Sequence, residues 1–463
     1  MVPDLFVIGA GPAGMTAAAL AAEKGAQVIV LDDQAGPGGQ IYRGVEGIDG
    51  GQETILGEDA IIGRDIARRF RASGARYRRG STVWQVTDDL EIAFSGPDGA
   101  HLVKADNIIL ATGAIERPFP VPGWTLPGVM TVGAAQTLLK ASALAAEGAV
   151  FVGTGPLVYL VAAQYARAGV SVVAVLDTTD AKPMIRAGRR LPAALLRADL
   201  LLKGRRWIRE VRATGTPVIR NVTDIQIEGD AAANRISYET ADGRRADLVS
   251  EHIFLHQGVV PNVNLSMSIG LAHSWHAAQA CWRPDTDPWG ASSVDGVFVA
   301  GDGAGIDGAV SAAAAGALSA LQVLTRLGRI SPGERDRLAR RPRGVRRREA
   351  RVRPFLDAWF RPADRFRVPS AAATMVCRCE EIRLGEISQT IKMGLADPNQ
   401  LKSSSRAGMG MCQGRFCGLT VQELIARESG RPASEVGYYR LRPPIKPVRV
   451  EDMTDLRIEV PDS

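Results

Sequence analysis

The chain opens with a short apolar run, continues into an alanine-rich stretch, and reaches a second apolar run that ends in an acid. Residues 5–8 predict a buried parallel strand, and residues 28–31 predict a second strand that ends at Asp32. The alanine-rich stretch between them predicts a helix. This strand–helix–strand order is typical of a nucleotide-binding α/β unit.

A glycine motif, Gly9-x-Gly11-x-x-Gly14, lies where the first strand meets the helix, with Pro12 and Ala13 inside it. The first glycine permits a tight turn, and the second lets backbone N–H groups approach a pyrophosphate. The third lets the helix pack closely on the strand. The helix N-terminus adds partial positive charge, so the motif predicts a dinucleotide site.

Two acids and a glycine-rich loop follow the second strand. Asp32 lies 18 residues after the last glycine of the motif, where a carboxylate can accept a hydrogen bond from a ribose hydroxyl. Asp33 comes next, and the loop over residues 36–43 contains Gly39 and Gln40, which suits a chain that runs beneath a flat ring system. A structural turn and a plain surface loop are the alternatives for these glycine-rich segments.

Residues 81–105 alternate between apolar and polar side chains and predict a hairpin or small meander. The next apolar strand ends in Ala111-Thr112-Gly113, and prolines at positions 118, 120 and 122 follow it. Because proline clusters interrupt regular structure, we expect the chain to leave the first domain there.

The opening pattern then recurs. An apolar run leads to Gly153-x-Gly155 and a helix, and a further strand ends at Asp177. Val158 replaces the third glycine, so helix and strand must pack differently. Asp177 favours a ribose hydroxyl over a 2′-phosphate. The repeat is either a working second nucleotide site or a scaffold that has lost its ligand.

A last strand, within residues 294–300, ends in Gly301-Asp302 just before an alanine-rich helix over residues 309–324. An acid at this point can bind a ribityl or ribose hydroxyl, and its alternative is a helix N-cap only. We therefore expect an α/β protein with five parts: a discontinuous first nucleotide-binding domain (1–122 and 262–330), a second one (123–261), a basic linker (331–370), a small helical cysteine-containing domain (371–430) and an extended C-terminal arm (431–463).

Charge is concentrated in one place. The whole chain has a net charge of +6, but ten arginines against two acids lie between Arg335 and Arg353. A solvated linker helix and a docking segment for an acidic partner both explain this stretch. Nucleic-acid binding is disfavoured, because no aromatic interleaving or recognition motif accompanies it. No apolar run reaches membrane-spanning length and no leader pattern opens the chain, so we expect a cytoplasmic protein that is not transmembrane.

Four of the five cysteines lie close together in the sequence. Cys377 and Cys379 form a Cys-x-Cys pair, and Cys412 and Cys417 form a Cys-x4-Cys pair 32 residues later. Four thiolates suit a 2Fe-2S cluster or zinc, and a Cys-x-Cys pair is awkward around one tetrahedral ion. Zinc and ordinary thiols stay open as alternatives to the 2Fe-2S cluster.

The first 330 residues resemble the flavoprotein disulfide reductases, which have two dinucleotide-binding domains. The resemblance rests on the first glycine motif, the Ala-Thr-Gly strand, the second glycine pair and the final Gly301-Asp302. It implies FAD, with its pyrophosphate over the first glycine motif, its adenosine ribose on Asp32 and its ribityl chain near Asp302. Disulfide reduction itself is excluded, since no cysteine pair accompanies the flavin motifs.

Over nearly its whole length, the chain resembles the α (A) subunits of bacterial heteromeric amine dehydrogenases, which include opine oxidases, D-hydroxyproline and proline dehydrogenases and hydrogen cyanide synthase. Its cysteine-rich part is similar to bacterioferritin-associated ferredoxin. The resemblance implies a hetero-oligomer in which a β subunit, with its own flavin, oxidises the amine and this chain passes the electrons on. It leaves open a small γ subunit, FMN at a subunit interface, and NAD or ATP in the second nucleotide domain.

No nucleophile–base–acid set is recognisable, so no catalytic residue is assigned from the sequence; cofactors are expected to carry the chemistry. Two rivals remain at this point. One is an NAD(P)H-dependent FAD/2Fe-2S oxidoreductase that acts alone. The other is a non-enzymatic redox scaffold or sensor. The proline-rich segment after Tyr439 is expected to lie across a partner chain.

Overall fold

The computed structural model describes residues 3–459, and its first layer is a five-stranded parallel sheet in the order β20-β7-β1-β2-β3. The strands are β1 (Leu5–Ile8), β2 (Val28–Asp32), β3 (Arg76–Arg79), β7 (Ile108–Leu110) and β20 (Val297–Val299). β1 lies in the middle and is buried throughout. The glycine motif that follows β1 therefore opens at the centre of the sheet's carboxyl edge, where ligands of such folds bind.

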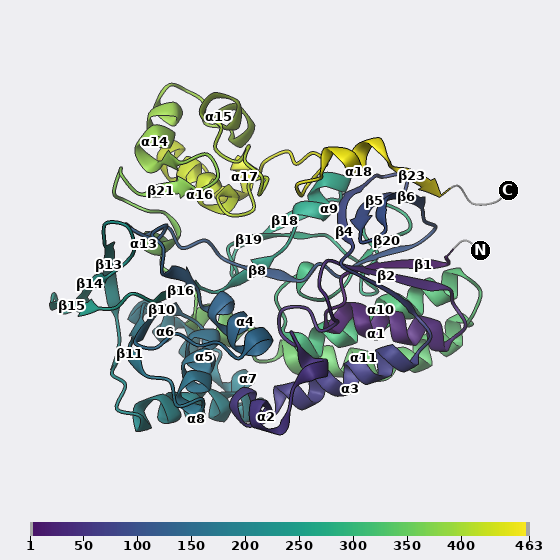
Figure 1. Ribbon diagram of the computed structural model, residues 1–463, viewed down its shortest axis with the longest axis horizontal. Helices are drawn as coiled ribbons and strands as arrows, with labels where there is room; N and C mark the ends of the chain where they lie inside the picture. The colour runs from purple at the N-terminus through teal and green to yellow at the C-terminus, as the bar shows by residue number, and fades with distance from the viewer. Residues whose placement is uncertain (1–2, 460–463) are drawn as a thin grey trace.

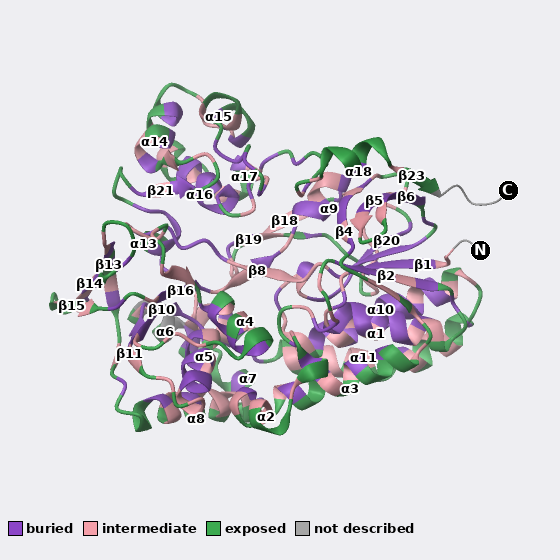
Figure 2. Cartoon of the chain, in the orientation of Figure 1, coloured by how far each residue is buried: buried purple, intermediate pink, exposed green. Residues whose placement is uncertain are grey.

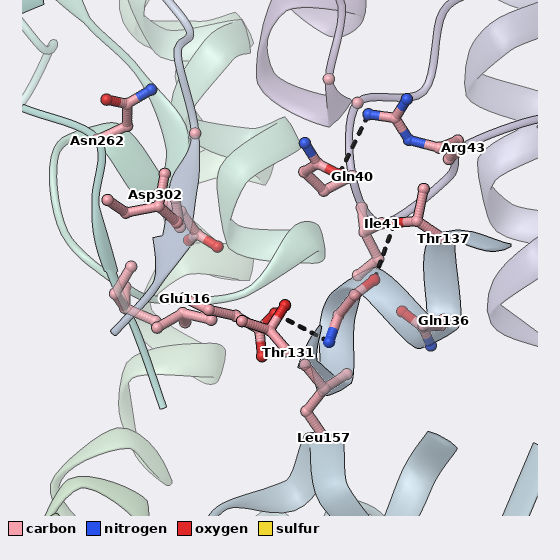
Figure 3. A pocket seen from close by; sticks show the side chains of 18 of the residues that line it. Gln40, Ile41, Arg43, Glu116, Thr131, Gln136, Thr137, Leu157, Asn262 and Asp302 are labelled. Atoms are coloured by element: carbon pink, nitrogen blue, oxygen red, sulfur yellow. Dashed lines mark hydrogen bonds between the residues drawn. The ribbon is translucent and has the colours of Figure 1, made fainter. Parts of the chain in front are cut away.

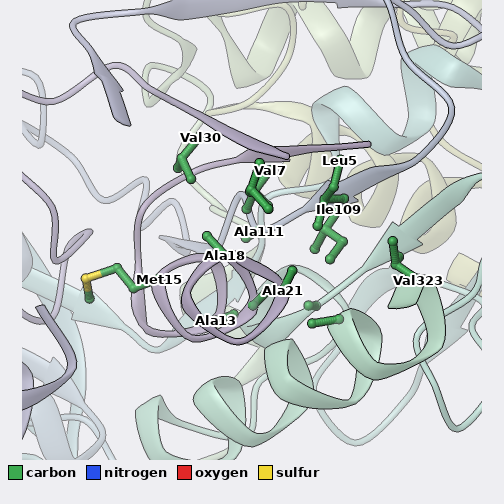
Figure 4. Packing of buried hydrophobic residues seen from close by; sticks show 14 of the residues in the cluster. Leu5, Val7, Ala13, Met15, Ala18, Ala21, Val30, Ile109, Ala111 and Val323 are labelled. Carbon is green, nitrogen blue, oxygen red and sulfur yellow. The ribbon is translucent and has the colours of Figure 1, made fainter. Parts of the chain in front are cut away.

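Two helices of small residues cover one face of this sheet (Figure 4). They are α1 (Pro12–Glu23) and α10 (Ala309–Arg326). A Cβ atom on Gly316 of α10 would lie 2.1 Å from the carbonyl oxygen of Ala13, so the two helix backbones touch. α10 is long and apolar enough to cross a membrane, but 61% of it is buried inside the fold, as expected of a core helix.

The predicted meander is present as β4 (Thr82–Val86), β5 (Glu91–Gly96) and β6 (Gly99–Lys104), all antiparallel. A fourth strand, β23 (Arg457–Glu459), joins it parallel to β6. The helix α3 (Asp59–Ala72) belongs to the same nucleotide unit and packs on α1.

The second nucleotide unit is built on another five-stranded parallel sheet, in the order β12-β11-β10-β16-β9. Its strands are β9 (Val129–Thr131), β10 (Ala149–Thr154), β11 (Val172–Asp177), β12 (Val218–Ile219) and β16 (Ile253–Gln257). Its helices are α4 (Val132–Ser142), α5 (Pro156–Arg167), α6 (Ala181–Gly188), α7 (Leu191–Leu195) and α8 (Ala198–Ala213). A three-stranded antiparallel sheet is attached: β13 (Val222–Glu228), β14 (Arg235–Thr240) and β15 (Arg245–Val249). The fold class expected from the repeated motif is confirmed.

The basic stretch within residues 331–370, expected as a linker, begins with a helix whose arginines contact the first nucleotide unit. In α11 (Pro332–Ala350), the guanidinium groups of Arg335 and Arg343 lie 4.2 and 4.3 Å from the ring centroid of Trp289. α12 (Arg353–Trp359) follows, and α13 (Asp364–Arg367) carries Phe366, whose ring meets that of Phe119 edge-on at 5.4 Å. The segment is therefore anchored to both nucleotide units.

The cysteine-containing domain lies apart from the two sheets, at the upper left of Figure 1. It contains β21 (Met375–Cys377), β22 (Ile382–Arg383), α14 (Leu384–Lys392), α15 (Pro398–Ser405), α16 (Gly418–Ser429) and α17 (Ala433–Val436). Buried aliphatic residues from α14 and α16 form its own core.

Residues 438–459, here called the C-terminal strap, run from this domain back over the first nucleotide unit. Tyr439 is buried in the core of the cysteine domain, and Ile445 is buried against the meander, where its N–H donates to the carbonyl of Trp84 at 2.9 Å. Lys446 forms an ion pair with Asp33 at 2.6 Å. The strap ends in α18 (Val450–Thr454), largely exposed in Figure 2, and β23.

The described arm therefore packs in part on the protein's own two domains, and its docking across a partner chain stays a prediction. Tyr439, Leu441 and Ile445 are covered by the protein's own domains, whereas Val450, Met453 and Ile458 are exposed. Residues 460–463 of the predicted arm lie outside the described residues.

Candidate functional site

A cavity of about 1280 Å³ is lined by several parts of the chain. Figure 3 shows part of its wall from close by. Residues of the first nucleotide unit, the second nucleotide unit, the cysteine domain and the strap all line it. The sequence predicted separate sites on separate domains, whereas the fold joins their walls into one space.

The first glycine motif lies at the start of α1 as predicted, and all of Gly9, Gly11, Pro12 and Ala13 line the cavity. Gly14 stands behind it, where an added Cβ atom would lie 1.8 Å from the carbonyl oxygen of Gly9. Gly14 therefore permits close packing of helix on turn, while Gly11 leaves backbone facing the cavity.

Asp32 and Asp33 have different surroundings at the end of β2. The Asp32 carboxylate lines the cavity and accepts hydrogen bonds from the N–H of Ala10 and, at 2.7 Å, from that of Gln34. Burial raises its pKa despite these two donors. Burial also opposes ionisation of Asp33, but its ion pair with Lys446 holds the Asp33 pKa below the usual value. Asp33 thus anchors the strap as well as lining the cavity.

The loop with Gly39 and Gln40 passes directly over the glycine motif. A Cβ atom on Gly39 would lie only 2.9 Å from Cα of Gly11, so backbone packs against backbone here. The side chain of Gln40 accepts from Arg43 at 3.1 Å. This loop forms part of the cavity wall, and its passage beneath a flat ring system stays a prediction.

Lys140 of α4 holds the same loop from the other domain. Its Nζ donates to the carbonyl of Ile41 at 2.8 Å and to Oε1 of Gln136 at 2.8 Å. Burial lowers the pKa of this lysine to about 7. The sequence analysis missed Lys140; a lone lysine on the apolar face of the helix was the available signal.

Ala111, Thr112 and Gly113 at the end of β7 line the cavity together with Gly301 and Asp302. The Asp302 carboxylate accepts from the N–H groups of Asp307 and Gly308, each at 3.0 Å, and burial raises its pKa. It therefore shapes the loop before α10 and also faces the cavity, so the two predicted alternatives, hydroxyl acceptor and structural cap, are compatible.

The second glycine pair is only partly open to the cavity. Gly155 lines it, but Gly153 does not, and a Cβ atom on Gly153 would lie 1.8 Å from the carbonyl oxygen of His256. The carboxylate of Asp177 is buried, accepts from the Tyr159 hydroxyl and, at 2.9 Å, from the Thr179 N–H, and does not line the cavity. Asp177 is thus engaged within the protein.

A carboxylate–imidazole pair stands beside this second motif and was not expected from the sequence. Nδ1 of His256 lies 2.6 Å from Oε1 of Glu116, whose Oε2 accepts from the Gly133 N–H at 2.9 Å. Both side chains line the cavity. The His256 imidazole is thus held by a carboxylate within the protein and also faces the cavity. Glu116 follows the Ala-Thr-Gly strand by only a few residues, a position that could have signalled it.

The four C-terminal cysteines come together as two contacting pairs, Cys377 with Cys417 and Cys379 with Cys412. The first pair and Cys412 are buried, and Cys379 is exposed. Contact with Cys417 and backbone N–H donors, including that of Gly408, lower the pKa of Cys377 to about 6. In the described part of the chain, no three His, Cys, Asp or Glu side chains converge on one point. Two thiol pairs suit two iron atoms better than one tetrahedral zinc.

The cysteine domain and the cavity share a wall. Residues that lie between the members of each cysteine pair line the cavity. They are Arg378 in the first pair and Arg415 and Phe416 in the second. Trp124 connects the two parts further, because its Nε1–H donates to the carbonyl of Met375 at 2.7 Å and its ring lies 5.5 Å from the Arg378 guanidinium. A group bound at the thiols is therefore held next to a group bound in the cavity.

The residues present fit both expected cofactors. For FAD, the backbone cradle of Gly11 and Gly39 and the buried carboxylates of Asp32 and Asp302 form a site for pyrophosphate and hydroxyl groups. For a 2Fe-2S cluster, the thiol pairs supply the ligands, and the N–H groups around them supply hydrogen bonds to the sulfurs. Cys281, the remaining cysteine, is buried, does not line the cavity, and has its pKa raised by burial to about 11. Cys281 therefore lies apart from the cavity that fits FAD.

Comparison with known proteins agrees with this geometry. Residues 3–317 match the family model "Pyridine nucleotide-disulphide oxidoreductase", and residues 375–427 match "BFD-like [2Fe-2S] binding domain". The A subunit of opine oxidase from Agrobacterium tumefaciens (strain Ach5) is 42% identical over 98% of this chain and 92% of its own. Hydrogen cyanide synthase subunit HcnB of Pseudomonas aeruginosa is 31% identical over 98% of both chains.

Among solved structures, L-proline dehydrogenase from P. horikoshii has the same fold, with a TM-score of 0.70 over 98% of this chain and 79% of that one, at 18% identity. FAD and a 2Fe-2S cluster are the cofactors of this oxidoreductase chain. The chain belongs to the pyridine nucleotide-disulphide oxidoreductase family and, within it, to the group represented by the A subunit of opine oxidase, with a BFD-like 2Fe-2S domain at its C-terminal side.

Proposed function

We propose that this chain is the electron-transferring subunit of a heteromeric dehydrogenase for opines or related secondary amines. The observation that carries the proposal is the shared wall: residues between the members of both cysteine pairs line the cavity that fits FAD. Bound there, FAD exchanges two electrons and a 2Fe-2S cluster exchanges one at a time. The chain's own residues hold these groups side by side and leave no thiol pair at the flavin.

The amine oxidation itself is assigned to a partner. The cavity wall presents one carboxylate–imidazole pair, Glu116 with His256, but its carboxylate is already held by the Gly133 N–H and by the imidazole. The similarity to a protein named as the A subunit of an opine oxidase supports a hetero-oligomer. We propose a β subunit with the second flavin and the substrate site. A further γ subunit, or FMN at the interface, is a finer alternative, and a cytoplasmic location is part of the same proposal.

The rival function, an NAD(P)H-dependent reductase that acts alone, rests on Gly155, Pro156 and Leu157, which line the cavity at the start of α5. Against it stands Asp177, whose carboxylate is engaged by Tyr159 and Thr179. A ligand such as NAD or ATP would have to bind at the second motif without this carboxylate.

The test is anaerobic reduction of the complete complex, purified with its co-expressed partner chains. A panel of opines and secondary amino acids should bleach the flavin and reduce the cluster. The isolated chain should respond neither to these amines nor to NADH. A Cys412→Ser variant is the matched control, since it should keep FAD but lose acid-labile sulfide. Rapid bleaching of the isolated chain by NADH would favour the rival, and amine oxidation by the isolated chain would overturn the assignment of that step to a partner.

A further inference from the structure

Tyr439, the second residue of the strap, covers the loop that carries Cys412 and Cys417. A Cβ atom on Gly408 would lie 2.6 Å from its ring, and one on Gly414 would lie 2.5 Å from it. The structure gives a reason for these two glycines, since any side chain there would displace the tyrosine ring.

The hydroxyl of Tyr439 is buried and lacks an ordinary partner. The side chain is only 3% exposed, and its oxygen finds no well-formed hydrogen bond within the described residues. The group it contacts is Sγ of Cys417, itself fully buried. Because a buried hydroxyl without a partner is unfavourable, this arrangement calls for an acceptor at the sulfur.

We propose that Tyr439 donates a hydrogen bond to Sγ of Cys417 when that sulfur is a cluster ligand, and thereby raises the reduction potential of the cluster. Reduction adds negative charge to the cluster and its sulfurs, and an O–H donor stabilises that charge more in the reduced form than in the oxidised form. Tyr439 is a positioning and tuning residue, and the inference rests on the four cysteines as the cluster ligands.

Because Tyr439 belongs to the strap, its backbone connects the two cofactor sites. Tyr439 lies beyond residues 375–427, which match the BFD-like domain, and it belongs to the strap. A few residues later the same strap bonds the Trp84 carbonyl through Ile445 and pairs Lys446 with Asp33 in the cavity wall. One segment therefore supplies a donor to the cluster and an anchor to the flavin site.

The test is a redox titration of the cluster in the intact complex, followed by EPR of the reduced form. Tyr439→Phe keeps the ring and removes the donor, so the reduced-to-oxidised ratio at a fixed potential should fall about tenfold. For a one-electron couple this is a shift of about 59 mV to more negative potential. Tyr438→Phe is the matched control, because that hydroxyl faces the Gly414 carbonyl at 3.5 Å, and it should leave the potential unchanged.

An unchanged potential in Tyr439→Phe, with the cluster present, overturns the inference. If that variant fails to assemble the cluster, 3-fluorotyrosine at position 439 decides the matter, because it keeps the packing and donates more strongly. It should move the potential in the positive direction, and no movement overturns the inference. Absence of iron and acid-labile sulfide from the wild-type complex would instead overturn the ligand assignment.

Discussion

Gly11 is a residue whose lack of a side chain matters for ligand binding and not for the backbone conformation. Its φ of −75° is available to any residue, and the nearest atom to an added Cβ would be Cα of Gly39 at 3.9 Å. A side chain at position 11 is therefore compatible with the fold, but it would fill the space expected for the pyrophosphate.

Gly11→Val should consequently yield folded protein without flavin, because the branched side chain occupies the space for the pyrophosphate. Absorbance in the flavin band and the thermal unfolding midpoint of the purified variant check this. Gly14→Val is the control, since its Cβ would lie 1.8 Å from the Gly9 oxygen and should lower stability itself. Full flavin occupancy in Gly11→Val would contradict the role given to this loop.

The buried Lys140 should make the free energy of unfolding depend on pH. Burial lowers its pKa to about 7, whereas an unfolded lysine titrates near pH 10.4. Between these values the unfolded chain binds more protons than the folded one, so the free energy of unfolding should rise with pH across about pH 7–10. The slope from this group is at most about 1.4 kcal/mol per pH unit.

Lys140→Met removes this titration together with the bonds to Ile41 and Gln136. The free energy of unfolding of the wild type should therefore rise relative to that of the variant as pH increases from 7 to 10. Thermal unfolding midpoints of both proteins at several pH values measure it. Parallel pH profiles would show that Lys140 keeps an ordinary pKa.

At the scale of elements, a buried ion cluster docks the iron–sulfur domain. Glu423 of α16 receives Arg367 of α13 at 2.7 Å and has Arg117, which follows β8 (Ala114–Glu116), at 3.8 Å. Arg117 is fixed in turn by the carbonyls of Gln279 and Ala280. Three separate elements thus meet at one carboxylate, and its loss would remove the carboxylate beside the buried Arg117, while Arg367 would keep its ion pair with Asp364.

Glu423→Ala should destabilise the docking by about 3–5 kcal/mol, as expected when one partner of a buried pair is removed. Hydrogen exchange should accelerate in α14 and α16 and at the Arg117 contact, while β1 and β7 stay protected. Glu451→Gln is the control, because its pair with Arg449 is exposed and worth about 0–1 kcal/mol. Equal exchange in Glu423→Ala and wild type would mean that apolar contacts alone hold the domain.

At the scale of the whole molecule, the strap connects what the sequence presents as separate modules. Truncation after residue 437 removes Tyr439 and Ile445 from two different cores, so it should weaken both cofactor sites. Truncation after residue 448 keeps these contacts and should retain flavin and cluster. Iron, sulfide and flavin contents of both proteins measure the difference. Equal contents after both truncations would show that the strap is dispensable.

Local sequence was enough to predict a feature wherever one short segment determines both the backbone conformation and the chemistry. The glycine motif apart from Gly14, the acid after β2, the Ala-Thr-Gly strand and the Gly-Asp before α10 all line one cavity. The cysteine spacing likewise indicated the iron–sulfur domain, which the family match confirms. Such motifs are readable because a tight turn, a helix N-terminus or a ligand pair restricts the residue types at fixed offsets.

The tertiary structure alone decided how these motifs combine. The Glu116–His256 pair joins residues 140 positions apart, and Lys140 reaches the loop at Ile41 across a domain boundary. Asp177 looked available in the sequence but is bonded by Tyr159, and part of the proline-rich strap packs on its own chain. Periodicity and motifs report local conformation, whereas the partners of a polar side chain depend on which elements pack together. The sequence therefore determined the modules and their cofactors, and packing decided the shared cavity between them.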